Sequence, residues 1–175
     1  MRGKTQLRIA TGKFGGRIIN SPRNRGTTQP MGERERLAIF NRIRSSLKDA
    51  AVLDAFAGSG ALGLTALSEN AKSADFLDND AKAQKTINEN IAKLGLQQQA
   101  RVIKRLTAQY DVIFADPPYD KPQYAKIEKL IDHLRPGGWL ILSHPGTPEP
   151  PAFLGLAMVS NRSYASAHIK IYQKI

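Results

Sequence analysis

The stretch VLDAFAGSGALG, residues 52–63, decides the fold class of this chain. It begins with apolar residues typical of a buried strand, passes through Asp54, and carries glycines at 58, 60 and 63 in the spacing GxGxxG. Glycines allow a tight turn and a close approach of a ligand to the backbone, and a following helix offers unpaired N–H groups in its first turn. The stretch therefore predicts a strand, a ligand-binding turn and a helix of an open α/β sheet.

Strand and helix patterns alternate downstream of this stretch. We expect strands over 51–56, 73–78, 100–104, 110–116 and 137–143, helices over 60–70, 80–95 and 122–134, and a closing antiparallel pair at 156–164 and 167–174. Such alternation predicts a mostly parallel, doubly wound α/β sheet.

Residues 1–48 read as a separate N-terminal element. Short apolar segments at 7–10 and 17–20 flank the sequence TGKFGG and predict a hairpin with a glycine turn. After a polar loop at 21–30, a helix is expected over 33–47, because Leu37, Phe40, Ile43, Arg44 and Leu47 fall at helical spacing. We therefore divide the chain into an extension, 1–48, and a core domain, 49–175.

Composition limits the class of protein. The chain has 175 residues, which suits one domain with a small extension. It contains no cysteine, which excludes disulfides and thiolate metal sites. No apolar run approaches the roughly 20 residues that span a bilayer, and the N-terminus has no hydrophobic signal core. These features fit a cytoplasmic protein.

The net charge of +11 is concentrated at one end of the chain. Residues 1–48 hold 12 Lys and Arg against 2 Asp and Glu, whereas residues 49–175 hold 14 against 13. A concentrated basic segment predicts a polyanion partner, with nucleic acid the first candidate. An anionic membrane is a weaker candidate, because the one basic amphipathic helix is short.

The stretch FADPPYD, residues 114–120, ends a predicted strand with an acid, two prolines and a tyrosine. An exocyclic amino group of a nucleobase is a poor nucleophile, so an enzyme that methylates it must fix the group by its N–H bonds. Asp116 and the carbonyl of Pro117 can accept those two N–H groups, and Tyr119 can stack on a base removed from its helix. The alternatives are an ordinary strand-exit turn and a metal site, but Asp120 is the only further ligand type beside Asp116.

Two cofactors fit the glycine-rich turn. Asp78 ends the next strand, 20 residues after Gly58, where an acid would bind ribose hydroxyls of NAD or of S-adenosylmethionine. Asp54 would lie awkwardly near a pyrophosphate but suits a ligand with an amino group and a sulfonium. We therefore expect S-adenosylmethionine.

With these motifs in place, the chain resembles the RsmD family of 16S ribosomal RNA (guanine-N2)-methyltransferases almost from end to end. The segments that carry the resemblance are RIATGKFGGRII at 8–19, ERERLAIFN at 33–41, VLDAFAGSGALGLTALS at 52–68, DPPY at 116–119, LRPGGWLILSH at 134–144 and RSYASAHIKIY at 162–172. The resemblance implies a class I methyltransferase fold, a Rossmann-like, mostly parallel seven-stranded sheet. It also implies S-adenosylmethionine as donor and one guanine of small-subunit rRNA as target, in the subunit or an assembly intermediate.

The predicted site follows residue by residue. The predicted catalytic residues are Asp116, Pro117, Pro118 and Tyr119. The predicted cofactor-binding residues are Asp54, Phe56, Ala57, Gly58, Ser59, Gly60, Asp78, Asn79 and Asp116. The predicted RNA-binding residues are Lys4, Arg8, Lys13, Arg17, Arg23, Arg25, Arg34 and Arg36. No metal is expected, and nothing in the sequence demands more than a monomer.

The chain also departs from the family pattern. Between RVIK and YDVIF the family has a longer segment with an acid near the adenine, whereas this chain has only RLTAQ, 105–109, so we expect weaker cofactor binding. A family helix acid is Leu37 here, the family's Thr-Thr is Met31-Gly32, and Ser143 replaces an acid. Three alternatives stay open: an adenine-N6 DNA or RNA methyltransferase, a protein-glutamine methyltransferase, which favours Asn at position 116, and a non-catalytic RNA-binding or assembly factor.

Overall fold

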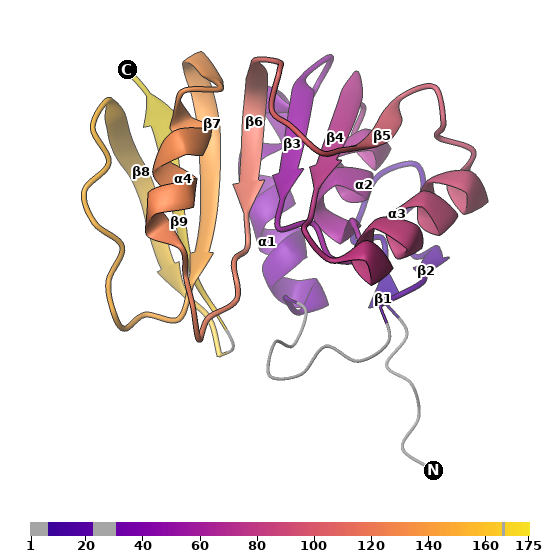
Figure 1. Cartoon of the computed structure of the whole chain (residues 1–175), viewed down its shortest axis with the longest axis horizontal. Helices are drawn as coiled ribbons and strands as arrows, with labels where there is room; N and C mark the ends of the chain where they lie inside the picture. Colours follow the sequence, from indigo (N-terminus) through magenta and orange to yellow (C-terminus); the bar gives the residue numbers. More distant parts are fainter. Residues whose placement is uncertain (1–6, 23–30, 166) are drawn as a thin grey trace.

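The computed structural model describes residues 7–22, 31–165 and 167–175, and its centre is a seven-stranded sheet in the order β5-β4-β3-β6-β7-β9-β8 (Figure 1). The strands are β3 (Ala51–Ala55), β4 (Ser73–Leu77), β5 (Ala100–Ile103), β6 (Tyr110–Ala115), β7 (Leu134–His144), β8 (Leu156–Ser163) and β9 (His168–Lys174). Strands β3 to β7 are parallel, and β9 is antiparallel to both β7 and β8. The predicted mostly parallel, doubly wound α/β sheet is confirmed.

The strand order reverses at β3, which lies between β4 and β6. In open α/β sheets, ligands bind beyond the carboxyl ends of the strands at such a switch point. In the register, Ala55 of β3 is opposite Leu77 of β4 and Ala115 of β6. The loops that follow these three strands therefore leave the sheet side by side, and they contain the glycine turn, Asp78 and Asp116.

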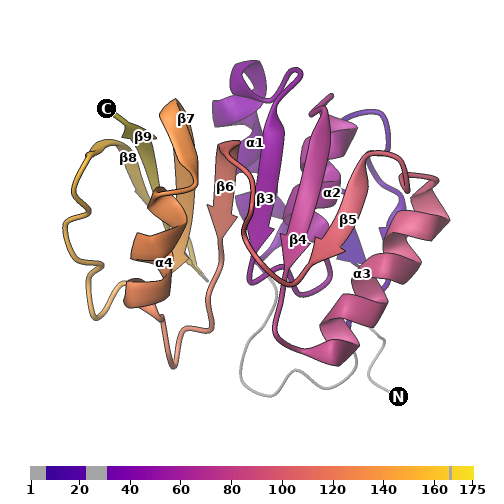
Figure 2. The same ribbon diagram turned by 45° about the horizontal axis from the view of Figure 1, so that its top comes forward.

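Helices cover both faces of the sheet. Helices α1 (Glu33–Ile43), α2 (Ala61–Ser68) and α3 (Ala81–Leu94) share one apolar cluster with inward-facing strand residues such as Val52 and Phe114. Helix α4 (Tyr124–Ile131) packs on the other face against Ile113 and Leu140 (Figure 2). None of these helices, within the described ranges, is long and apolar enough to cross a membrane.

The face that carries α4 is otherwise covered by loops. Residues 104–109, the segment that is short in the sequence, contain no helix between β5 and β6. Leu106 and Ala108 of this segment and Phe153 of the β7–β8 connection pack against the apolar residues of that face. These side chains exclude water where a longer connection would place an additional element.

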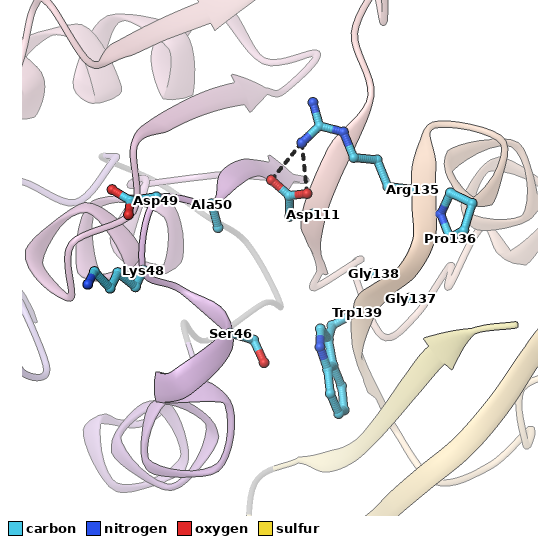
Figure 3. Close-up of a pocket in the computed structure, with 10 residues that line it drawn as sticks. All are labelled: Ser46, Lys48, Asp49, Ala50, Asp111, Arg135, Pro136, Gly137, Gly138 and Trp139. Atoms are coloured by element: carbon cyan, nitrogen blue, oxygen red, sulfur yellow. Dashed lines mark hydrogen bonds and ion pairs between the residues drawn. The ribbon is translucent and has the colours of Figure 1, made fainter.

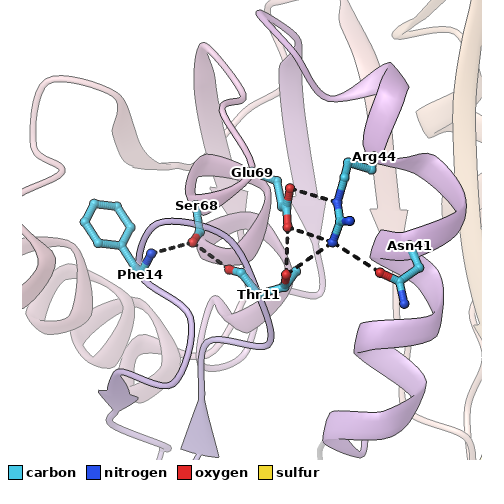
Figure 4. Close-up of polar contacts among 6 residues, drawn as sticks. All are labelled: Thr11, Phe14, Asn41, Arg44, Ser68 and Glu69. Carbon is cyan, nitrogen blue, oxygen red and sulfur yellow. Dashed lines mark hydrogen bonds and ion pairs between the residues drawn. The ribbon is translucent and has the colours of Figure 1, made fainter.

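The N-terminal hairpin is docked on the core along α2. Strands β1 (Leu7–Arg8) and β2 (Ile18–Ile19) pair antiparallel, as predicted. The turn is held at the C-terminal end of α2, because Lys13 N donates to Ser68 O at 3.0 Å and Phe14 N donates to Ser68 Oγ at 2.8 Å (Figure 4). Gly12 is required there, since a Cβ would lie 2.3 Å from Ser68 O. Apolar residues on both sides of position 48 lie in one core, so the division at 48 remains our proposal.

Helix α1 buries part of the face that the spacing predicted, since Phe40, Ile43 and Leu47 are all buried. It ends at Ile43, and a short 3₁₀ turn, η1 (Arg44–Ser46), completes the predicted segment. Leu37 is 39% exposed, whereas Arg36 is 2% exposed and lies on the buried face with Ile39, Phe40 and Ile43. The prediction that Leu37 and Arg44 belong to the packed face is therefore wrong.

Helix and strand ends differ from prediction around α4. The helix expected over 122–134 ends at Ile131, because Leu134 already pairs with Tyr110 in the sheet. Strand β7 therefore begins before the predicted Gly137, with a register shift in its pairing with β6. Helix α3 begins and ends as expected: Asp80 accepts from Lys82 N, and Gly95 ends the helix at φ +69°.

Candidate active site

The glycine turn joins β3 to α2 with a backbone that only small or strained residues adopt. Phe56, Gly58 and Gly60 have φ of +61°, +59° and +79°. Gly63 lies in the first turn of α2, and a Cβ there would meet the ring of Phe76 at 2.5 Å. The first two glycines therefore shape the turn, and the third lets α2 approach β4 closely.

Asp78 ties the glycine turn to the end of β4. Its carboxylate accepts from Gly58 N at 2.8 Å and from Asp80 N at 2.9 Å. Gln84 of α3 donates to the Asp78 carbonyl at 2.7 Å. The residue is half-buried directly after the carboxyl end of β4, and Asn79 beside it is exposed. This is where an acid meeting a ribose is expected in this fold.

Asp54 lies deeper than Asp78. It is 1% exposed, and its carboxylate accepts from Gly63 N in the first turn of α2 at 2.8 Å. A carboxylate at a helix N-terminus is stabilised by the unpaired N–H groups and the helix dipole. Asp54 therefore stabilises the glycine turn by binding the start of α2. Its predicted contact with the methionine part of a cofactor remains a prediction.

The Asp-Pro-Pro-Tyr loop follows β6 directly. Asp116 is half-buried, one position beyond Ala115, which pairs with Leu142 of β7. Tyr119 folds back so that its hydroxyl hydrogen-bonds the side chain of Ser143 at the end of β7. Burial, followed by the charge of Asp116, raises the pKa of Tyr119 to about 12. The side chain is therefore neutral at physiological pH, and its hydroxyl is held in place.

Helix α1 supplies two charged side chains to this region that the sequence pattern did not place there. Glu35 is 9% exposed, and its charge acts on the Tyr119 hydroxyl. Its carboxylate folds over Gly32, where a Cβ would lie 2.1 Å from Oε2. Arg36 is 2% exposed and close enough to Asp116 for the two charges to interact.

Seven of the eight predicted RNA-binding residues fall into three groups, and Arg36 stands apart from them. Lys13 and Arg17 are exposed at the hairpin turn, with Lys13 Nζ and Arg17 Cζ at 5.2 and 5.0 Å from the centre of the Phe14 ring. Arg34 is exposed on α1, and Arg8 is half-buried and donates to Gly16 O at 3.1 Å. Lys4, Arg23 and Arg25 lie outside the described residues.

Arg36 does not fit the prediction of a phosphate contact. Its guanidinium is buried and donates to Met31 O at 2.8 Å and to Arg8 O at 3.0 Å. A phosphate outside the protein cannot reach a side chain that is 2% exposed, so we remove Arg36 from the RNA-binding set. The signal was present in the sequence, because Arg36, Phe40 and Ile43 share one helical face.

A neighbouring cation, Arg44, is likewise engaged within the protein. It lies at the end of α1 and pairs with Glu69, with Nε 3.1 Å from Oε2, and it also donates to Asn41 and Thr11 (Figure 4). Glu69 in turn accepts from the Thr11 hydroxyl at 2.8 Å. This network fixes the hairpin turn to α1 and α2.

A pocket of about 500 Å³ lies at the opposite edge of the sheet (Figure 3). It is lined by Ser46, Lys48, Asp49, Ala50, Asp111 and residues 135–139. Arg135 donates to both carboxylate oxygens of Asp111 at 2.7 and 2.8 Å, so the two charges form an ion pair within the lining. The pocket contains none of the predicted site residues, so the loops at the carboxyl ends of β3, β4 and β6 remain the candidate site.

Comparisons with known proteins point to the same chemistry. A family model described as "Conserved hypothetical protein 95" matches residues 7–173. The Bacillus subtilis (strain 168) protein "Putative rRNA methyltransferase YlbH" is 31% identical over 184 residues, which cover 96% of this chain and 99% of that protein. The Escherichia coli (strain K12) protein "Ribosomal RNA small subunit methyltransferase D" is 34% identical over 146 residues, 79% of this chain and 71% of that protein.

A solved structure gives the same result for the fold. The protein described as "Putative methyltransferase yhhF from Escherichia coli" superposes with a TM-score of 0.84 at 25% identity, over 97% of this chain and 98% of that one. The class I methyltransferase fold and the resemblance to RsmD proteins are both confirmed.

Proposed function

The chain belongs to the family described as "Conserved hypothetical protein 95", and from that premise we propose that it transfers a methyl group from S-adenosylmethionine to the exocyclic N2 amino group of a guanine in 16S rRNA. The target lies in the small ribosomal subunit or its assembly intermediate, and the protein acts in the cytoplasm as a monomer. Residues 49–175 carry the chemistry, and residues 1–48 help to hold the RNA.

The observation that carries this proposal is the register of β3 and β6. Because Ala55 pairs with Ala115, the glycine turn and Asp116 leave adjacent strands at the same level. A cofactor on the glycine turn and a base on the Asp-Pro-Pro-Tyr loop would therefore meet at the switch point of the sheet.

The residues present fit S-adenosylmethionine. Gly58 and Gly60 leave the backbone of the turn without side chains at two positions, and Asp78 offers a carboxylate for ribose hydroxyls. The half-buried carboxylates of Asp78 and Asp116, with the negative charge of the buried Asp54 behind the turn, suit a ligand with an amino group and a sulfonium better than one with a pyrophosphate. Phe56, Ala57, Ser59, Gly60 and Asn79 complete the proposed cofactor site, and the cofactor supplies the electrophilic methyl group.

The chain's own residues orient the nucleophile. Asp116 accepts one N–H of the target amino group, and the Pro117 carbonyl accepts the other. Pro117 and Pro118 restrict the backbone, so both acceptors keep fixed positions. Tyr119 stacks on the base, and its bond to Ser143 holds the ring at the end of β7. Holding the nitrogen in line with its electrophile supplies the orientation part of catalysis.

The hairpin turn supplies the proposed phosphate contacts. Lys13 and Arg17 are exposed around Phe14, on a turn that Ser68 anchors through two backbone groups. Ser68 ends α2, and the eight residues of that helix separate the hairpin turn from the glycine turn, a rise of about 12 Å. The RNA would then be held at a distance from its target base. Arg8, Arg34, Lys4, Arg23 and Arg25 remain proposed contacts.

The decisive experiment measures transfer of label from S-adenosylmethionine to unmethylated small subunits, with naked 16S RNA and Asp116→Ala protein alongside. Label recovered as N2-methylguanine, and lost in Asp116→Ala, would support the proposal. Label recovered as N6-methyladenine would favour an adenine methyltransferase. If the protein binds RNA but neither binds the cofactor nor transfers label, it is a non-catalytic RNA-binding factor.

A further inference from the structure

Arg36 is a buried cation with one donor unused. Its Nη1 and Nη2 donate to the carbonyls of Met31 and Arg8, which join the start of α1 to strand β1. Within the described part of the chain, its Nε has no hydrogen-bond partner. Burying a guanidinium is costly unless nearby charge compensates. The position of Arg36 therefore calls for a partner that its two carbonyl contacts do not provide.

The packing of α1 on β6 places that partner at Asp116. The rings of Phe40 and Phe114 are in contact, with centres 5.5 Å apart. Arg36 is one helical turn before Phe40 on the same face, and Asp116 follows the last residue of β6, two residues after Phe114. The four residues from Arg36 to Phe40 rise about 6 Å along the helix, and two residues of extended chain span about 6.6 Å. Helix α1 begins at the edge of the sheet where β6 ends (Figure 1). The step from Phe40 back to Arg36 and the step from Phe114 on to Asp116 therefore run in the same direction and are of similar length.

The electrostatics agree with this geometry. Burial lowers the pKa of Arg36, and the negative charges of Glu33, Asp116 and Glu35 oppose that shift. The interaction is reciprocal, so the guanidinium favours the ionised form of Asp116. The charge of Asp116 also acts on the Tyr119 hydroxyl, which is neutral at physiological pH, and the carboxylate of Glu35 acts on both Arg36 and Tyr119.

We propose that Arg36 is a positioning residue for Asp116, which keeps this carboxylate ionised and fixed where it accepts the N–H of the target base. The assignment rests on the proposed function for the role of Asp116, and on the structure alone for the pairing. With this role for Arg36, the N-terminal element is part of the active site, because Arg36 connects β1 and α1 to the loop that follows β6.

Arg34 provides a matched control for the titration of Asp116, which involves no RNA. It lies two residues away on the same helix and is exposed, so its replacement changes the charge by the same amount without disturbing the buried pair. Arg36→Gln removes the cation, Arg36→Lys keeps a charge without the planar fork, and Arg34→Gln tests charge alone.

The first test does not depend on catalysis. The carboxyl ¹³C resonance of Asp116 is titrated in the wild type and in the three variants, each checked for cooperative unfolding. We expect Arg36→Gln to raise the pKa of Asp116 by about one unit or more, Arg36→Lys to raise it less, and Arg34→Gln to leave it near the wild-type value. The pairing would be overturned if the pKa of Asp116 stayed at its wild-type value in both Arg36→Gln and Arg36→Lys.

The second test asks whether Arg36 acts through Asp116 in methyl transfer. With small subunits as substrate, Arg36→Gln should lower kcat about tenfold or more and move the acid limb of the pH profile to higher pH. In an Asp116→Asn background the same change should have no further effect, as a double-mutant cycle requires for coupled residues. Additive losses would overturn the positioning role. A shifted Asp116 titration in a protein that transfers no label would instead refute the proposed function and retain the pair.

Discussion

The hydroxyl of Tyr119 is hydrogen-bonded to the side chain of Ser143, so the tyrosine of the Asp-Pro-Pro-Tyr loop is fixed to the end of the neighbouring strand. Ser143 is 1% exposed and follows Leu142, the partner of Ala115 in the sheet. The loop after β6 is thus closed by a side chain from β7. A ring held through its hydroxyl as well as its backbone is ready to receive a base without first losing rotational freedom.

Replacing Ser143 with alanine should therefore weaken methyl transfer without removing it. A neutral hydrogen bond contributes about 1 kcal/mol, which corresponds to a rate lower by about fivefold. The bond to Ser143 lowers the pKa of Tyr119, so its loss should move that pKa above its value of about 12. Single-turnover kinetics and an ultraviolet titration of tyrosine measure the two effects.

Tyr119→Phe is the matched control, since it keeps the ring and removes only the hydroxyl. We expect its rate to equal that of Ser143→Ala, and the double variant to be no slower. A double variant much slower than either single one would mean that Ser143 acts on something other than Tyr119.

Gly63 should tolerate no side chain. A Cβ at this position would lie 2.5 Å from the Phe76 ring and 3.1 Å from Cβ of Asp54. Gly63→Ala should therefore lower the free energy of unfolding by about 1–3 kcal/mol through overpacking, as measured by urea denaturation. Phe76→Leu should recover part of that loss in the double variant.

Gly95→Ala separates this packing effect from backbone strain. Gly95 has φ +69°, and no atom lies within 4 Å of the position that a Cβ would take, so its replacement costs only the left-handed conformation, about 1 kcal/mol. If Phe76→Leu brings no recovery to Gly63→Ala, the collision with the ring is not the cause.

Local motifs allowed much of this structure to be predicted from the sequence. Contacts between segments that are distant in the sequence could not be predicted. The glycine spacing and Asp116–Tyr119 predicted the switch-point site, because turn geometry and strand ends are encoded within a few residues. The helical spacing of Arg36, Phe40 and Ile43 indicates that Arg36 lies on the apolar face, but it does not indicate what Arg36 contacts there. Its burial arises from packing of α1 on β6, which only the tertiary structure defines.

The anchoring of the hairpin could not be predicted for a related reason. Asn90 of α3 is 0% exposed and donates to the carbonyls of Asn20 and Ser59, both at 2.9 Å. It also accepts from Asn20 N at 2.7 Å. One amide side chain thus joins the hairpin, the glycine turn and α3, and no local pattern around Asn90 indicates it.

The hairpin turn should contribute salt-sensitive RNA affinity. Lys13→Gln and Arg17→Gln each remove an exposed cation beside Phe14. We expect weaker binding to 16S RNA and a log–log salt slope smaller by about one for each lost phosphate contact. Filter binding at several salt concentrations measures both quantities.

Lys129→Gln is the control, because Lys129 is exposed on α4, which covers the other face of the sheet. It should change neither the affinity nor the slope. An unchanged slope in both hairpin variants would remove the hairpin turn from the RNA-binding surface.

The short segment between β5 and β6 should weaken cofactor binding. Residues 104–109 contain no helix, and Leu106 and Ala108 of this segment turn to the apolar side of the sheet. An acidic side chain that could bind the adenine amino group is absent from positions 104–109. We therefore expect a Kd for S-adenosylmethionine above the low-micromolar range by calorimetry. Thr107→Asp should tighten binding if an acid in this segment reaches the adenine, and Thr107→Asn should not. A Kd in the low-micromolar range or below for the wild type would show that other residues hold the adenine.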